Sequence, residues 1–198
     1  MCLLLWPIYT HVRSINAQQQ LELQWQKAYV ENHTPKPTPV EPGAKPTQKP
    51  KQGARRKFPA TKLMIPELGL EAIVVEGVSL SKLKQGPGHF PGTAAPGDPG
   101  NCCIAGHRNV YGSWFRNLDK LSPGDAVILS TPDGDYIYQV TDTFIVRPSD
   151  LSVLDQGLKC KLTLITCTPV PKPTHRLIVV AELIACHRSD TQPSSSIL

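Results

Sequence analysis

The sequence contains no uninterrupted apolar run long enough to span a membrane. Its first nine residues, Met-Cys-Leu-Leu-Leu-Trp-Pro-Ile-Tyr, carry no charge, but a membrane-spanning helix needs about 20 apolar residues. The run also lacks the positive leader and the small-residue cleavage site of a signal peptide. It is therefore either a buried N-terminal segment or the outer end of a transmembrane helix whose first half is missing from this chain. We favour the second interpretation because Trp6 and Tyr9 are typical of a membrane interface.

The sequence also lacks the C-x-x-C and H-x-x-x-H spacings of zinc sites. No acidic cluster argues for calcium, so we expect no metal and no other cofactor. A domain of this size folds without disulfides. Cys102 and Cys103 are adjacent and must face opposite sides of a strand, so one of them should face the core. Whether Cys160 and Cys186 form a disulfide stays open.

A basic face on a folded domain is missing too, although the chain carries a net charge of +5. Residues 34–57 contain six prolines, seven Lys or Arg and one acid, and so carry +6, whereas residues 58–198 sum to −1. A Pro- and Lys-rich segment of this kind is typical of an extended spacer. Its cations are also suited to an anionic membrane or wall surface. With no nucleic-acid motif on the neutral domain, we expect no nucleic-acid partner.

The composition divides the chain into four parts. Residues 1–33 form a membrane-proximal segment with a stalk helix, predicted over Ser14 to Asn32 from its helix-forming residues. Residues 34–57 are the spacer, residues 58–186 the folded domain, and residues 187–198 a polar tail that we expect to be disordered. No internal repeat is present.

The folded domain reads as about eight short strands with few helical turns, which indicates an all-β barrel or sandwich. An Asp-Gly pair after Pro132 predicts a tight hairpin. A helical turn is predicted over Ser79 to Lys84 and a short helix over Ser113 to Leu118. The main predicted strands are Lys62 to Ile65, Leu70 to Glu76, Asn101 to Gly106, Asp125 to Thr131, Asp135 to Val146, Lys161 to Cys167 and Arg176 to Ile184.

Three reactive side chains stand at predicted strand ends. The run Leu-Thr-Leu-Ile-Thr-Cys delivers Cys167 to a Pro-rich loop, His107 follows Gly106, and Arg176 opens the last strand. A thiolate stabilised by a nearby cation is a nucleophile, and an arginine can hold the oxyanion of a tetrahedral intermediate. A single cysteine at a strand end is more often structural than catalytic. His89, His175 and His187 are the alternative candidates for the histidine of the site. The combination nevertheless favours a cysteine nucleophile.

These motifs resemble the sortase family from about Lys62 to Leu183: a Thr-Leu-x-Thr-Cys strand end, an arginine opening the last strand and a histidine after the fourth. The resemblance implies a closed eight-stranded barrel and a membrane-tethered transpeptidase. Such an enzyme cleaves a Leu-Pro-x-Thr-Gly-like signal between Thr and Gly through a thioacyl intermediate and joins the new carboxyl to an amine. It implies Cys167 as nucleophile, His107 as acid and base, Arg176 as oxyanion and substrate ligand, and Thr166 lining the site.

The resemblance also implies partners and a location. The donors are surface proteins with C-terminal sorting signals, and the acceptor is a peptidoglycan or pilin amine. The enzyme sits at the cell membrane, held through its N-terminus, with the catalytic domain outside the cell and facing the wall.

The segment Gly-His-Arg-Asn-Val-Tyr-Gly is most similar to class E sortases, with class D as the runner-up. In class E a tyrosine placed like Tyr111 is associated with a preference for Leu-Ala-x-Thr-Gly, whereas the alternative is that Tyr111 packs at the barrel rim. Two other functions stay open: a cysteine hydrolase on the same barrel and a non-catalytic wall-binding barrel.

Overall fold

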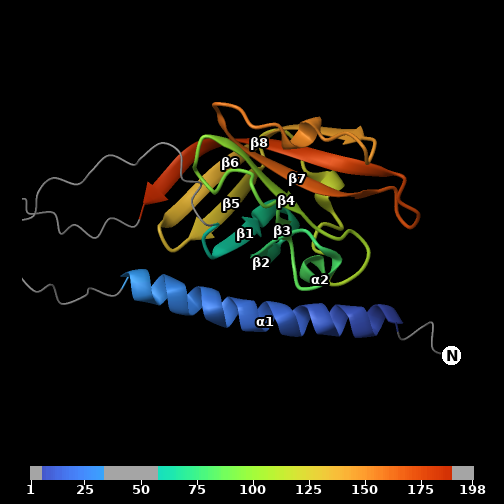
Figure 1. The fold of residues 1–198 in the computed structure, drawn as a ribbon, viewed down its shortest axis with the longest axis horizontal. Helices are drawn as coiled ribbons and strands as arrows, with labels where there is room; N and C mark the ends of the chain where they lie inside the picture. Colours follow the sequence, from blue (N-terminus) through green and yellow to red (C-terminus); the bar gives the residue numbers. More distant parts are fainter. Residues whose placement is uncertain (1–5, 34–57, 189–198) are drawn as a thin grey trace, which may run out of the picture.

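The computed structural model of the chain describes residues 6–33 and 58–188, in which one long helix lies along a closed β-barrel (Figure 1). The predicted spacer and most of the predicted tail lie outside the described residues. The elements in chain order are α1 (Trp6–His33), β1 (Thr61–Ile65), η1 (Pro66–Leu68), β2 (Leu70–Glu76), α2 (Leu80–Leu83), β3 (Gly88–His89), β4 (Gly100–Ala105), η2 (Leu118–Lys120), β5 (Ala126–Thr131), β6 (Gly134–Val146), η3 (Ser152–Leu154), β7 (Cys160–Thr168) and β8 (His175–Arg188).

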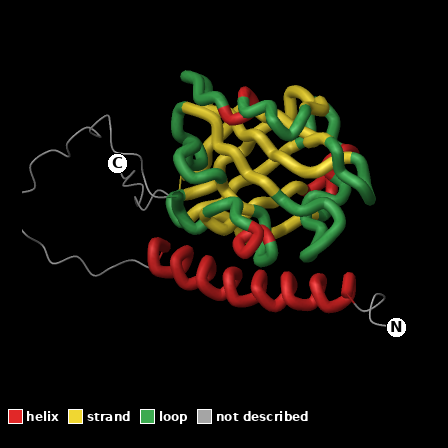
Figure 2. Tube along the Cα trace, turned by 45° about the vertical axis from the view of Figure 1, so that its right-hand side comes forward, coloured by secondary structure: helices red, strands yellow, loops and turns green. Residues whose placement is uncertain are grey.

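The predicted eight-stranded barrel is confirmed. The strands pair in the order β1-β2-β3-β4-β7-β8-β6-β5, and β5 pairs with β1 to close the barrel. Most pairs are antiparallel, but β2 runs parallel to β3 and β4 runs parallel to β7. Figure 2 shows the crossing strands wrapped by loops, with helix confined to short turns and α1.

Alternation along the strands separates the barrel interior from its outer face, because successive side chains point to opposite sides. In β7, Leu162 and Leu164 belong to the core cluster, and in β8, Leu177 and Val179 do. Cys102 also joins this core while Cys103 lies outside it, as the adjacent pair predicts. Residues at the intervening positions therefore face outward from the barrel.

Local predictions were mostly confirmed. The hairpin of β5 and β6 turns at Pro132-Asp133, where Thr131 Oγ1 accepts from Asp133 N (3.2 Å) and donates to Gly134 O (3.0 Å). The predicted helix over Ser113 to Leu118 was wrong, because that segment forms turns before η2. β8 also runs to Arg188, so its last two residues fall within the segment predicted as a disordered tail.

Helix α1 is longer than predicted, and it packs against the barrel instead of standing away from it as a stalk. The Gln18 side chain is buried and bonds both polar groups of Ile73: its Nε2 donates to Ile73 O (3.0 Å), and its Oε1 accepts from Ile73 N (2.7 Å). On this side of β2, β3 pairs with Val75 and Glu76 and does not reach Ile73. The backbone N–H and C=O of Ile73 therefore bond to the Gln18 side chain of α1. Further along, Lys62 forms an ion pair with Glu22 (3.3 Å).

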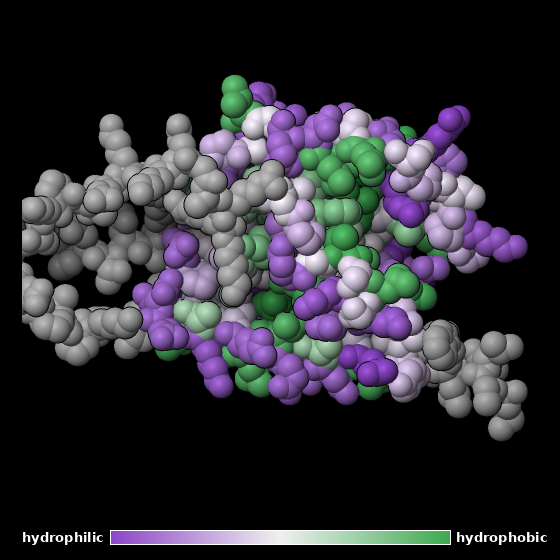
Figure 3. Space-filling view, in the orientation of Figure 1, coloured by the Kyte–Doolittle hydropathy of each residue, from purple (hydrophilic) through white to green (hydrophobic). Residues whose placement is uncertain are grey.

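The outward side of α1 mixes hydrophilic side chains with isolated apolar ones in Figure 3. Val12, Leu23 and Val30 are among the exposed apolar residues. Over residues 6–33 and 58–188, no helix combines the length and the apolar character needed to cross a membrane.

Candidate active site

Cys167 and Arg176 face each other across strands β7 and β8. They are directly paired in the antiparallel register, so their side chains share one face of the sheet, with Cα atoms about 4.5–5.5 Å apart. Because the core takes the alternate positions, both side chains point outward from the barrel. The strand β7 ends at Thr168, one residue after the cysteine, as the Pro-rich sequence predicts.

His107 reaches the same place from the parallel strand β4. The β4–β7 pairing ends with Ala105 opposite Ile165, and Gly106 N continues the ladder by donating to Ile165 O (3.0 Å). The chain then continues alongside the last residues of β7, which ends at Thr168, so His107 follows beside the cysteine strand. The three residues singled out from the sequence as catalytic are thus brought to one end of three neighbouring strands.

Two hydrogen bonds fasten the histidine segment to the cysteine segment. Thr166 Oγ1 donates to Gly106 O (2.8 Å), and Arg108 Nη1 donates to Thr168 Oγ1 (2.8 Å). The residues on either side of His107 are therefore bonded to the residues on either side of Cys167. Thr166 is only 2% exposed and Arg108 only 9%, so these bonds are shielded from water and hold the two segments in a fixed relation.

Arg108 is itself anchored on two further sides. Its Nη2 forms an ion pair with Asp119 Oδ1 (2.9 Å), and its Nε donates to Arg116 O (3.3 Å). A planar guanidinium can serve three acceptors at once in a fixed geometry, which an ammonium cannot do. Arg108 belongs to the Gly-His-Arg segment quoted from the sequence, but no pattern gave a positioning role to Arg108 or Thr168. Their only signal was that they adjoin the predicted catalytic residues.

The imidazole of His107 is half-buried, and its surroundings lower its pKa. Burial, followed by the nearby positive charge of Lys84, lowers the pKa of His107 from its ordinary value of 6.5. Its Nε2 is buried and has no hydrogen-bond partner within residues 6–33 and 58–188. The ring lies against Tyr111, with centroids 5.3 Å apart and planes tilted by 41°. An imidazole with an unused nitrogen is ready to exchange a proton with a substrate.

Comparisons with known proteins place the barrel in a family. Residues 63–184 match the Sortase domain family, which is more than half of the chain. The chain belongs to the sortase family.

Relatives of the chain include sortases of two classes. Sortase SrtE1 of Streptomyces coelicolor is 36% identical over 138 residues, covering 62% of this chain and 39% of the relative. Sortase D of Bacillus subtilis is 33% identical over 108 residues, covering 54% and 53%. The chain therefore spans only about two fifths to half the length of these relatives.

Solved sortase structures share the fold. Sortase E1 of Streptomyces coelicolor, crystallised with a tripeptide in the active site, superposes with a TM-score of 0.63 at 31% identity, covering 70% of this chain and 96% of that one. A sortase D5 transpeptidase of Clostridium perfringens superposes with a TM-score of 0.60 at 38% identity, covering 64% and 79%. The barrel of this chain is thus a sortase barrel.

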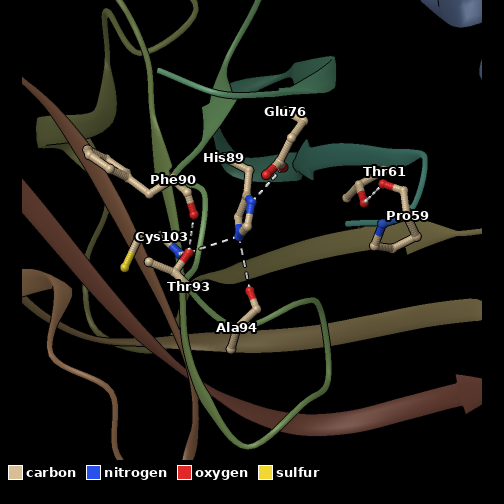
Figure 4. Close-up of polar contacts among 8 residues, drawn as sticks. All are labelled: Pro59, Thr61, Glu76, His89, Phe90, Thr93, Ala94 and Cys103. Carbon is tan, nitrogen blue, oxygen red and sulfur yellow. Dashed lines mark hydrogen bonds and ion pairs between the residues drawn. The ribbon is translucent and has the colours of Figure 1, made fainter. Parts of the chain in front are cut away.

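The rival histidine His89 is held in a structural network instead (Figure 4). Its Nδ1 lies 2.7 Å from Glu76 Oε2, and its Nε2 lies 2.8 Å from Thr93 Oγ1 and 3.1 Å from Ala94 O. The ring also stacks on Phe58, with centroids 4.0 Å apart. Both nitrogens are occupied and the residue is 2% exposed, so His89 ties the first residues of the domain to the barrel.

The other cysteines of the sortase are poorly suited to nucleophilic attack. Burial raises the pKa of Cys103 to about 12 and the pKa of Cys102 well above its usual range. Cys160 also has a raised pKa from burial, and it is a free thiol, as is Cys186. Within the described ranges, no group of three or more His, Cys, Asp or Glu side chains is placed to hold a metal ion.

We predict that Arg108→Lys lowers kcat about 10- to 100-fold and leaves KM for the donor peptide nearly unchanged. Lysine keeps the charge but cannot reach Thr168, Asp119 and Arg116 O together, and small displacements of reacting groups are costly. Steady-state kinetics on a sorting peptide would measure the effect. Arg116→Lys, at an exposed position of the same segment, is the matched control and should retain activity. An Arg108→Lys enzyme with normal kcat would show that the guanidinium does not position the site.

Proposed function

We propose that this sortase is a cysteine transpeptidase that cleaves a sorting signal of the Leu-Pro-x-Thr-Gly or Leu-Ala-x-Thr-Gly kind and transfers the donor to an amine. The observation that carries the proposal is the placement of Cys167 and Arg176 as direct partners across β7 and β8, with His107 bonded alongside through its neighbours. A nucleophile, a proton carrier and a fixed cation are the minimum set for acyl transfer through a covalent intermediate.

In the first step the Cys167 thiolate attacks the carbonyl carbon of the substrate threonine. The carbonyl oxygen becomes an oxyanion, and Arg176 is the cation placed opposite the cysteine to stabilise it. His107 then gives a proton to the nitrogen of the departing glycine as the C–N bond breaks. The products of this step are a thioester on Cys167 and a peptide with a new amino terminus.

In the second step an acceptor amine attacks the thioester carbon. The amine passes a proton to His107, an amide bond forms, and Cys167 leaves as a thiolate. His107 is protonated again, so the site returns to its starting state. A thioester preserves the activation of the original peptide bond until the amine arrives, which suits transfer better than direct hydrolysis.

We also propose the biological setting implied by the family. The donors are surface proteins with C-terminal sorting signals, and the acceptor is a peptidoglycan or pilin amine. The catalytic domain acts outside the cell at the membrane and faces the wall, with the N-terminal segment on the membrane side.

Tyr111, next to His107, is proposed to bind the second residue of the signal and to favour alanine over proline there. The substrate-binding role of Thr166 stays a prediction. In the structure, its hydroxyl donates a hydrogen bond to Gly106 O.

Mass spectrometry of products from paired Leu-Ala-x-Thr-Gly and Leu-Pro-x-Thr-Gly peptides, each incubated with diglycine, tests the proposal. We expect cleavage between Thr and Gly and a ligated product, with more product from the alanine peptide. Release of free acid alone would indicate a cysteine hydrolase, and intact peptides would indicate a non-catalytic wall-binding barrel.

Tyr111→Ala should reduce the preference for the alanine peptide over the proline peptide. An unchanged ratio of the two ligated products would show that Tyr111 does not determine specificity.

A further inference from the structure

A cavity of about 560 Å³ lies between helix α1, helix α2 and Tyr111. This size is within the range of small-molecule sites. Its walls come from both sides of the α1–barrel contact, so it exists only because the helix is docked. The lining residues are Tyr9, Thr10, Arg13, Ala17, Leu80, Ser81, Lys84, Gln85 and Tyr111.

The α1 wall of the cavity is fixed by buried polar contacts. Ser14 is fully buried: its Oγ donates to Tyr111 O (3.0 Å) and accepts from Trp114 Nε1 (3.1 Å). The backbone it holds is unusual, since Tyr111, Gly112 and Ser113 have φ of 49°, 83° and 50° in succession. Non-glycine residues take this left-handed conformation only where surrounding contacts enforce it. The helix therefore helps to set the shape of the loop that carries Tyr111.

The charge of the cavity is positive on two sides and is not neutralised by its walls. Arg13 and Lys84 line it, and among the described residues of the lining there is no carboxylate. Neither cation has an acidic partner within 4.0 Å among the residues that the structure describes. Each lies over an aromatic ring of the lining: Arg13 Cζ is 5.7 Å from the Tyr9 centroid, and Lys84 Nζ is 5.2 Å from that of Tyr111. Two oriented cations flanking one cavity favour an anionic group.

The cavity is one aromatic ring away from the catalytic histidine. Tyr111 lines the cavity, and its ring contacts both Lys84 and His107. The charge of Lys84 also acts on His107, which shows that the two are electrostatically close. A molecule seated against Arg13 and Lys84 can therefore extend past Tyr111 to the place where protons are exchanged.

From these contacts we propose that the cavity binds a carboxylate carried by the acceptor amine, through Arg13 and Lys84, and so directs that amine to the thioester. The inference rests on the transpeptidase function proposed above. The donor signal has no fixed charge for these cations to bind, whereas an amino-acid or peptide amine ends in a carboxylate. The site selects the acceptor, and it lets the enzyme prefer such an amine over water.

The test compares two acceptors that differ only in the carboxylate: diglycine and glycylglycinamide. With the intact chain we expect kcat/KM for the acceptor to be about tenfold higher for diglycine, which corresponds to one or two exposed charge-assisted contacts. Arg13→Gln and Lys84→Gln should each bring the ratio of the two acceptors toward one. Taking the ratio within each variant removes any effect of Lys84 on His107 that is common to both acceptors.

The matched control is Lys82→Gln, which removes an equal charge from α2 at a residue that does not line this cavity and should keep the tenfold ratio. Lys82→Gln should also leave the hydrolysis of the donor peptide without amine unchanged. Equal use of the two acceptors by the unaltered enzyme, or an unchanged ratio in both cavity variants, would overturn the inference alone. Failure of any amine to give ligated product would overturn the transpeptidase function itself.

Discussion

Replacing Cys167 with alanine is expected to abolish both cleavage and transfer of a sorting peptide, by a factor of about a thousand or more. Alanine has no group that can form the acyl intermediate, and loss of a covalent nucleophile removes most of the rate enhancement of an enzyme. The half-exposed position of Cys167 opposite Arg176 leaves its Sγ accessible to a substrate carbonyl. Single-turnover assays with a fluorescent peptide, followed to the hydrolysis background, would measure the loss.

The matched control is Cys103→Ala, a buried cysteine on the neighbouring strand β4 whose pKa is raised to about 12. That variant should keep a functional site even if its stability falls, and thermal unfolding would report the latter. A thiol-directed label should modify Cys167 and block activity. Retention of peptide cleavage by Cys167→Ala would remove the proposed enzyme function, because Cys167 is the cysteine paired directly with Arg176.

His107→Ala is expected to lower kcat/KM by about 100- to 10,000-fold, which is the usual contribution of a general acid and base. The fold should remain intact, since the His107 side chain is half-buried and makes no hydrogen bond among the described residues. His187→Ala, an exposed histidine at the far end of β8, is the control and should behave as the unaltered enzyme. Circular dichroism would separate a chemical from a structural effect, and an unfolded His107→Ala would assign that residue to the fold.

The pH dependence follows from the lowered pKa of His107. In the folded protein this imidazole binds a proton less readily than in the unfolded chain, so its protonation opposes folding. Its contribution to stability is therefore complete above the unfolded pKa of 6.5 and is lost as the pH falls through the folded pKa. An NMR titration should place the His107 pKa below 6.5, and Lys84→Gln should raise it. A pKa at or above 6.5 in the unaltered protein would contradict the burial seen here.

The barrel was predictable because the local sequence signals for its strands and turns agree with one another. Alternating apolar residues, the Asp-Gly turn at Gly134 and the Pro-rich stop after Cys167 each specify strand ends over a few residues. The candidate catalytic residues were singled out for a similar reason: each stands at a strand end, and their types match one chemistry. The helix predicted over Ser113 to Leu118 failed because that segment is shaped by contacts with α1 and the barrel, which override its propensity.

The sequence by itself determined the strands, the reactive side chains and the family they resemble. Only the tertiary structure decided that Arg108 and Thr168 lock His107 to Cys167, since that bond joins residues 60 positions apart. It also decided that α1 packs on the barrel and that Arg13 and Lys84 line one cavity. Such contacts depend on the closure of the barrel and on helix docking, and a hydrogen bond between distant segments leaves no periodicity in the sequence from which to predict it.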